Sequence, residues 1–169
     1  MDEQLRALYE EVILEHNRHP RHFQENPPGS THHAHGFNQL CNDEIDVHLK
    51  VEDGIIREIG FEGAGCAVAI ASASLMTEAV RGKSLSETQT LFGNVHRMLA
   101  EAGPAENVGK LRVLEGVHEF PMRVKCATLP WHTLQAALDG RQDTVCTEEN
   151  SPFCPQPIDP LAAVSEQAW

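Results

Sequence analysis

The fold of this chain is decided by the stretch Phe61-Glu62-Gly63-Ala64-Gly65-Cys66-Ala67-Val68-Ala69-Ile70-Ala71-Ser72-Ala73-Ser74-Leu75-Met76. Gly63 and Gly65 have the backbone freedom to reverse the chain within a few residues, and the small and apolar residues after them favour a closely packed helix. We therefore predict a strand that ends, a turn, and a buried helix that begins at Cys66 and ends at Arg81-Gly82-Lys83.

Cys66 is consequently expected at a helix N-terminus, where unpaired backbone N–H groups and the helix dipole stabilise a thiolate. A thiolate is the form of cysteine that binds metal or attacks sulfur. A single buried cysteine is more often a small core residue. The interpretation of Cys66 therefore depends on which side chains lie near it.

Length and composition limit the class of protein. The 169 residues suit one domain with a tail, and the formal net charge of −12 argues against nucleic acid and anionic membranes as partners. No apolar run approaches the roughly 18 residues of a membrane span. The acidic N-terminus resembles no targeting segment, so we expect a cytoplasmic protein. There, the five cysteines are better interpreted as thiols or metal ligands than as a disulfide framework.

Outward from the quoted stretch, residues 44–61 alternate apolar and polar side chains around a tight turn at Asp53-Gly54. This pattern predicts a β-hairpin with one buried face. A third strand is expected from the residues before Cys41. An amphipathic helix is predicted over residues 3–16.

Downstream of the quoted stretch, Ser84 and Glu87 form a capping box that predicts a helix ending before Gly103-Pro104. A short connecting element is expected over residues 111–117. A last helix is predicted to end at Gly140.

Residues 1–140 are thus predicted to form one domain. Residues 141–169 contain four prolines and few core-type residues, which predicts a proline-rich and mostly irregular tail. The tail cysteines, Cys146 and Cys154, match no metal-binding pattern, and we interpret them as incidental thiols.

Three histidines, His32, His33 and His35, lie close together in the sequence and could bind metal. Such a cluster is more often an exposed loop with adventitious metal binding or none. We adopt that interpretation here.

A candidate metal site comes from the hairpin. Cys41 and Asp43 lie just before it and Cys66 just after it, so the returning strands can bring the three side chains together. If Cys126 starts the last helix at the same end, the group becomes three thiolates and a carboxylate, a donor set for tetrahedral zinc or for iron and sulfide. The spacing is not that of a paired-cysteine zinc finger, and separate cysteines with Asp43 capping a turn are the alternative.

Four motifs occur in a characteristic order: Leu8 to Asn17, Cys41-Asn42-Asp43, Gly63-Ala64-Gly65-Cys66 and Lys125-Cys126-Ala127-Thr128-Leu129. With them, residues 5–140 resemble the IscU/SufU (NifU N-terminal domain) family of iron–sulfur cluster assembly proteins.

Within that family the chain is more similar to the SufU branch. That branch has a longer insertion between the second and third cysteines, here Arg81 to Val117, and a lysine before the third cysteine, here Lys125.

The resemblance implies an α+β fold in which a small three-stranded antiparallel sheet is packed by about five helices. It implies a zinc site made by Cys41, Asp43, Cys66 and Cys126. It also implies a sulfur acceptor that takes persulfide sulfur from a SufS-type cysteine desulfurase, with Cys41 as the acceptor. Lys125 either adds positive potential to this site or is a plain exposed lysine.

The chain departs from the family pattern at Asn42, where glycine is usual. Asparagine is the non-glycine residue that best tolerates a positive φ, so we expect the turn to be kept.

Three functions stay open at this point. The first is zinc-dependent sulfur relay to a separate downstream scaffold, a sulfurtransferase-type step without independent turnover. The second is a scaffold that builds a [2Fe–2S] cluster on Cys41, Cys66 and Cys126 and transfers it to apo-proteins. The third is a binding module whose zinc is purely structural. A zinc hydrolase or deaminase is not expected, because the sequence has neither H-x-E nor P-C-x-x-C.

Overall fold

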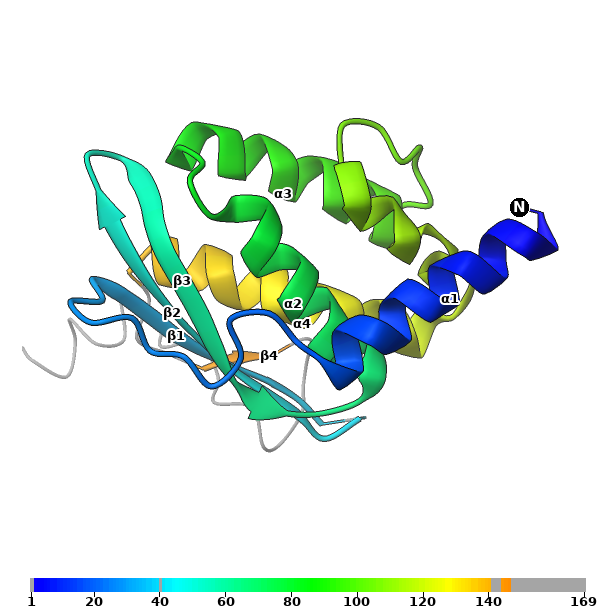
Figure 1. Ribbon diagram of the computed structural model, residues 1–169, viewed down its shortest axis with the longest axis horizontal. Helices are drawn as coiled ribbons and strands as arrows, with labels where there is room; N and C mark the ends of the chain where they lie inside the picture. The colour runs from blue at the N-terminus through cyan, green and yellow to red at the C-terminus, as the bar shows by residue number, and fades with distance from the viewer. Residues whose placement is uncertain (1, 40, 141–143, 147–169) are drawn as a thin grey trace, which may run out of the picture.

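The computed structural model describes residues 2–39, 41–140 and 144–146. In chain order its elements are α1 (Glu3–Arg18), β1 (His32–Asn38), β2 (Asp43–Glu52), β3 (Ile55–Ala64), α2 (Ala67–Val80), α3 (Leu85–Ala100), the 3₁₀ helix η1 (Gly109–Glu119), α4 (Pro121–Leu138) and β4 (Val145–Cys146). Figure 1 shows the sheet with the helices α2, α3 and α4 on one side of it. α4 contacts β1 and β2, and α2 contacts β3.

The sheet has the strand order β3-β2-β1-β4. β2 pairs antiparallel with both β1 and β3, and the two-residue β4 pairs parallel with β1. The predicted α+β class, with three antiparallel strands and about five helices, is therefore confirmed for the described residues. β4 is an addition that the sequence analysis does not predict. It belongs to the predicted tail, of which residues 141–143 and 147–169 lie outside the described residues.

The predicted β2–β3 hairpin is present. Asp53 and Gly54, at its turn, have φ angles of 54° and 72°, the left-handed values that such a tight turn requires. The strand register shifts after Lys50, as in a β-bulge. Because of this shift, Ile56 and Ile59 are both buried in the core although they are three residues apart.

Two local predictions are wrong. The histidine cluster is not a loop, because His32–Asn38 form β1. α4 begins at Pro121 and not at Cys126. Proline is favoured in the first turn of a helix, where its missing N–H has no partner to lose. Cys126 consequently lies in the second turn of α4.

No helix in the described part of the chain is long and apolar enough to cross a membrane. This agrees with the absence of a long apolar run in the sequence.

α1 is joined to α2 through the buried side chain of His16. Its Nδ1 lies 2.8 Å from Ser74 Oγ, and the same hydroxyl oxygen accepts the backbone N–H of Arg21 at 2.8 Å. Nε2 of His16 has no hydrogen-bond partner among the described residues. Protonation would place a charge there with nothing to accept its proton, so the folded state favours the neutral imidazole.

This burial makes stability depend on pH. Burial lowers the pKa of His16 below its ordinary value of 6.5, and the positive charges of Lys110 and Arg21 lower it further. The unfolded chain then binds a proton that the folded chain does not, so stability should fall as the pH drops below about 6.5. His16→Gln is expected to reduce the slope of unfolding free energy against pH, by at most about 1.4 kcal/mol per pH unit.

The measurement is urea unfolding at a series of pH values on either side of neutrality. His19→Gln, which replaces an exposed histidine just after α1, is the matched control. If the slope is the same in His16→Gln as in the unmodified protein, His16 does not cause the pH dependence of stability.

Candidate metal centre

Four side chains from three parts of the chain meet at one place: Cys41, Asp43, Cys66 and Cys126. Cys41 lies in the turn between β1 and β2, and Asp43 begins β2. Cys66 is the N-cap of α2, as predicted, and Cys126 lies on α4. One potential ligand atom from each residue lies within 4.8 Å of all the others. The structure thus brings together the four residues that the sequence singled out.

Asp43 is fully buried and is held by its neighbours. Its Oδ1 accepts the backbone N–H of Cys66 at 2.7 Å, and its Oδ2 lies 3.8 Å from Cys66 Sγ. The side-chain amide of Asn38 donates to Oδ2 at 3.5 Å. One carboxylate oxygen therefore fixes Asp43 against the start of α2, while the other faces the thiols.

Two glycines allow this close approach. A Cβ at Gly65 would collide with Oδ1 of Asp43, so a larger residue would push the carboxylate away from the N–H of Cys66. Gly63 has a φ of 141°, and a Cβ there would collide with the backbone carbonyl of Glu44 on β2. The turn that the sequence predicts from these glycines is therefore also the place where β2 and α2 come together.

Cys126 is fully buried, and its Sγ lies 2.8 Å from Cys41 Sγ. This exceeds the ~2.05 Å of a disulfide bond, and both residues are free thiols. The amide of Asn38 donates to Cys126 Sγ at 3.5 Å. The sulfur atoms are thus held together by a hydrogen-bond network and not by a covalent bond.

The donor set fits a tetrahedral ion. With Zn–S of ~2.3 Å and Zn–O of ~2.1 Å, the ligand atoms of such an ion lie about 3.4 to 3.8 Å apart. Cys66 Sγ and Asp43 Oδ2 already have this separation, whereas Cys41 and Cys126 would need to move apart by about 1 Å. Thiolates also hold iron–sulfur clusters, so these residues suit zinc or iron.

The three thiols differ in acidity. The pKa of Cys66 is lowered to about 7, first by the hydrogen bond from Cys126 and, against the effect of burial, by the backbone N–H groups of Ala69 and Val68. The pKa of Cys126 is raised, mainly because its thiol proton is hydrogen-bonded to Cys66 and because the Cys126 side chain is buried. Burial is also the main reason that the pKa of Cys41 is raised. A bound cation would favour full deprotonation of the group.

Asn38 is a site residue that the sequence analysis missed. It ends β1, is fully buried, and contacts both the carboxylate of Asp43 and the sulfur of Cys126. Its only signal in the sequence is a polar residue at a helix-facing strand position. That signal becomes visible only when the register of β1 is known.

The other predicted features lie around or away from this site. Asn42 adopts a φ of 53°, the positive value expected where glycine is usual. Lys125 is partly exposed, and its side chain forms no hydrogen bond or ion pair within the described ranges, so its electrostatic role stays a prediction. Cys146, on β4, is disulfide-bonded, so its interpretation as an incidental thiol is wrong. Cys154 lies outside the described residues.

The three histidines do not reach the four-residue site. His32, His33 and His35 lie on β1, and no potential metal group of the described residues joins them to the cysteines. Nδ1 of His32 contacts the hydroxyl of Thr31 at 2.7 Å. His33 and His35 instead contact Asp46 on β2.

Comparison with known proteins adds the family context. Residues 8–127 match the model of the NifU-like N-terminal domain. The chain is 33% identical over 133 residues to the zinc-dependent sulfurtransferase SufU of Bacillus subtilis, covering 78% of this chain and 89% of that protein. It is 36% identical over 136 residues to the iron–sulfur cluster assembly scaffold protein IscU of Thermotoga maritima, covering 79% and 94%. These values do not favour the predicted SufU branch over IscU.

A solved structure has a similar fold. It is described as an iron–sulfur cluster assembly scaffold protein for the SUF system of Fervidobacterium islandicum. It matches with a TM-score of 0.69 at 32% identity, covering 78% of this chain and 97% of that one.

The contact between the backbone at Gly65 and the carboxylate of Asp43 can be tested directly. Gly65→Ala should weaken zinc binding, because the new Cβ displaces the carboxylate of Asp43, and should lower stability by about 1–3 kcal/mol. Gly93→Ala is the matched control, because a Cβ there, on α3, meets no atom within 4 Å. Competition with a chromophoric chelator and urea unfolding measure the two effects. If zinc affinity is unchanged in Gly65→Ala, the space at Gly65 does not hold the Asp43 carboxylate in place.

Proposed function

Because the chain belongs to the family of NifU-like N-terminal domains, we propose that it is a cytoplasmic iron–sulfur cluster assembly protein that acts as a zinc-dependent sulfur acceptor. It takes persulfide sulfur from a SufS-type cysteine desulfurase and passes it to a downstream scaffold or apo-protein. The donor set of three cysteines and an aspartate supports a zinc site. The similarity to a zinc-dependent sulfurtransferase supports the sulfur-transfer role.

The observation that carries the proposal is the position of Cys41 in a turn. Cys66 and Cys126 are held by α2 and α4, and Asp43 is fixed by a hydrogen bond to the start of α2. Cys41 has no such element around it, because it lies between the end of β1 and the start of β2. It is therefore the ligand that can leave the group with the smallest change in the fold.

The transfer step is redox-neutral. When zinc is bound, it keeps the thiols deprotonated and close together. The Cys41 thiolate attacks the outer sulfur of the persulfide on the desulfurase. A new S–S bond forms at Cys41 Sγ, the S–S bond of the donor persulfide breaks, and the cysteine of the desulfurase leaves as a thiolate. The proton of the persulfide stays on the transferred sulfur.

Lys125 is proposed to support this step. It directly precedes Cys126 and is partly exposed, and a cation near the site favours thiolates.

A scaffold for a [2Fe–2S] cluster is the second candidate function. The identity to the IscU scaffold of Thermotoga maritima and the three cysteines, which are also cluster ligands, favour it. Purely structural zinc is the third candidate, because all four positions of a tetrahedral ion would be taken by protein ligands.

The decisive change is Cys41→Ser, with Asn42→Gly as the matched control. Asn42 already has a φ that glycine adopts freely, so its replacement should leave the turn intact. Incubated with a SufS-type desulfurase and cysteine, the unmodified protein and Asn42→Gly should each gain one sulfur atom at Cys41 and accelerate the desulfurase. Cys41→Ser should do neither. Peptide mass spectrometry and the rate of alanine release are the measurements.

Metal analysis of protein purified without air separates the candidates. Sulfur transfer requires one zinc per chain, bound more weakly in Asp43→Ala. Brown protein with iron and sulfide in equal amounts would replace the proposal by the scaffold. A colourless zinc protein that leaves the desulfurase rate unchanged would replace it by structural zinc.

A further inference from the structure

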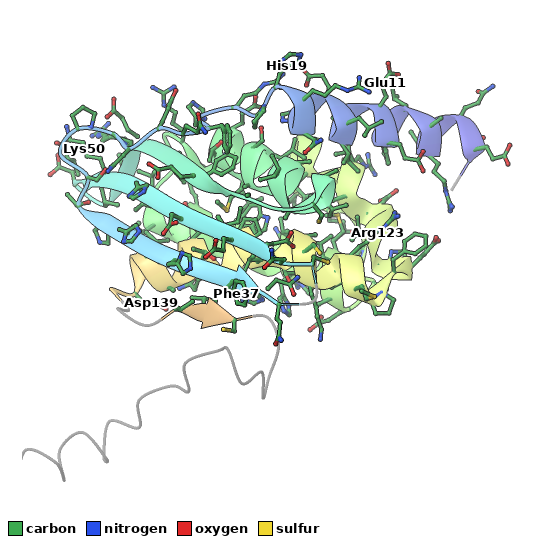
Figure 2. The ribbon with its side chains drawn as sticks, turned by 90° about the horizontal axis from the view of Figure 1, so that it is seen from below. Glu11, His19, Phe37, Lys50, Arg123 and Asp139 are labelled. Atoms are coloured by element: carbon green, nitrogen blue, oxygen red, sulfur yellow. The ribbon has the colours of Figure 1, made fainter. Side chains whose placement is uncertain are left out.

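The side of the sheet that faces away from the helices carries a second group of potential metal ligands. Strand alternation places the following imidazoles and carboxylates there: His33 and His35 on β1, Glu44, Asp46 and His48 on β2, and Glu62 on β3. Figure 2 looks onto this side, and no helix of the described chain covers β1 and β2 between the labelled Lys50 and Phe37. The group is open to solvent, with 52% of the His33 side chain and 32% of the Asp46 side chain exposed.

The strand register brings these side chains into contact. His33 lies directly opposite His48, and His35 lies directly opposite Asp46. A single atom, Asp46 Oδ1, lies 3.2 Å from His33 Nε2 and 3.0 Å from His35 Nδ1. The rings of His33 and His48 stack, with their centroids 4.6 Å apart. Two imidazoles from one strand therefore meet a carboxylate of the next.

The two distances from Asp46 Oδ1 to the imidazoles suit ligands of a shared ion. Nitrogen and oxygen ligands about 2.1 Å from one metal lie about 3.0 Å apart in octahedral and about 3.4 Å apart in tetrahedral geometry. The other nitrogen of His35, Nε2, faces Glu44 Oε1 at 3.6 Å, so a second carboxylate lies beside the same ring.

From this geometry we propose that His33, His35 and Asp46 bind a divalent transition-metal ion of the zinc or nickel class. Imidazole nitrogen and carboxylate oxygen are ligands that such ions accept. Three protein ligands leave a position open to water, as in an exposed zinc site. His48 stacks against His33.

Binding needs a small rearrangement. Among the described residues, the cysteine group alone already has its potential ligand atoms close enough together to hold an ion. To close the second group, the His33 ring would leave its stack on His48 and turn toward His35. Glu44 and Glu62 add negative charge on the same face, which attracts a cation.

The second site is separate from the first. Asp43 and Asp46 both belong to β2, but they are three positions apart, so they lie on opposite faces of the sheet. Asp43 faces the helices and is fully buried, whereas Asp46 faces solvent. The proposal therefore does not depend on the function of the cysteine group.

The test is zinc titration by calorimetry of the full chain without a histidine tag, with the cysteine site already loaded. The unmodified protein should take up one more ion than His35→Asn does at the same zinc concentration. Loss of outer-shell residues alone lowers metal affinity about 10- to 100-fold, so His35→Asn and Asp46→Asn should each weaken the additional ion at least about 10-fold.

His32→Asn is the matched control, because His32 is on the same strand and its side chain contacts Thr31 instead of Asp46. It should keep the additional ion. The proposal is overturned if the unmodified protein binds no additional ion, if His35→Asn binds it equally well, or if His32→Asn weakens it as much. Retention of the first ion and of the circular dichroism spectrum shows that each variant is folded. The site is assigned from the difference between variants, so the result does not depend on which metal the cysteines hold.

Discussion

The structure depends on one partly buried hydrogen bond, from the backbone N–H of Cys66 to Oδ1 of Asp43. It joins the first residue of β2 to the N-cap of α2 and so couples the sheet to the helices at the point where the thiols meet. A buried carboxylate without partners is strongly unfavourable. The start of a helix is suited to hold one, because its N–H groups are unpaired and its dipole favours negative charge. Gly65 leaves room for this contact.

The buried carboxylate also adds to the effects that set the acidity of the site. Burial and hydrogen bonds among the thiols cause the largest pKa shifts, and the Asp43 charge makes ionisation of Cys41 and Cys66 harder still, since like charges repel at short distance. The chain relieves this by leaving protons on Cys126 and Cys41, whose pKa values are raised, while Cys66 carries the most acidic thiol. A cation removes the repulsion, since it deprotonates the thiols and screens the carboxylate together. The site is therefore arranged for an ion even though every atom in it has a partner.

The sequence predicts structure well where a residue type such as glycine constrains the backbone, or where apolar residues recur at a regular spacing. Gly63, Gly65 and the Asp53-Gly54 turn determine the hairpin, and the hairpin brings Asp43 to Cys66. The strand β1 was harder to predict, because its inward residues include Gly36 and Asn38, which give no apolar alternation. For the same reason Asn38 was missed as a site residue. β4 is too short for any periodic signal, and the start of α4 is set by a proline whose position in the first turn depends on the helix after it.

The separation of two ligand groups on β2 follows from strand geometry and needs no further element. Side chains alternate between the faces of a strand, so a slip of one residue would carry Asp43 to solvent and Asp46 into the apolar layer. The buried residues Ile45, Val47 and Leu49 oppose that slip, because all three would become exposed. Burial of these apolar side chains therefore holds both groups in place at once. A mutation that weakens this register should disturb the cysteine group and the histidine face together, although neither group touches the other.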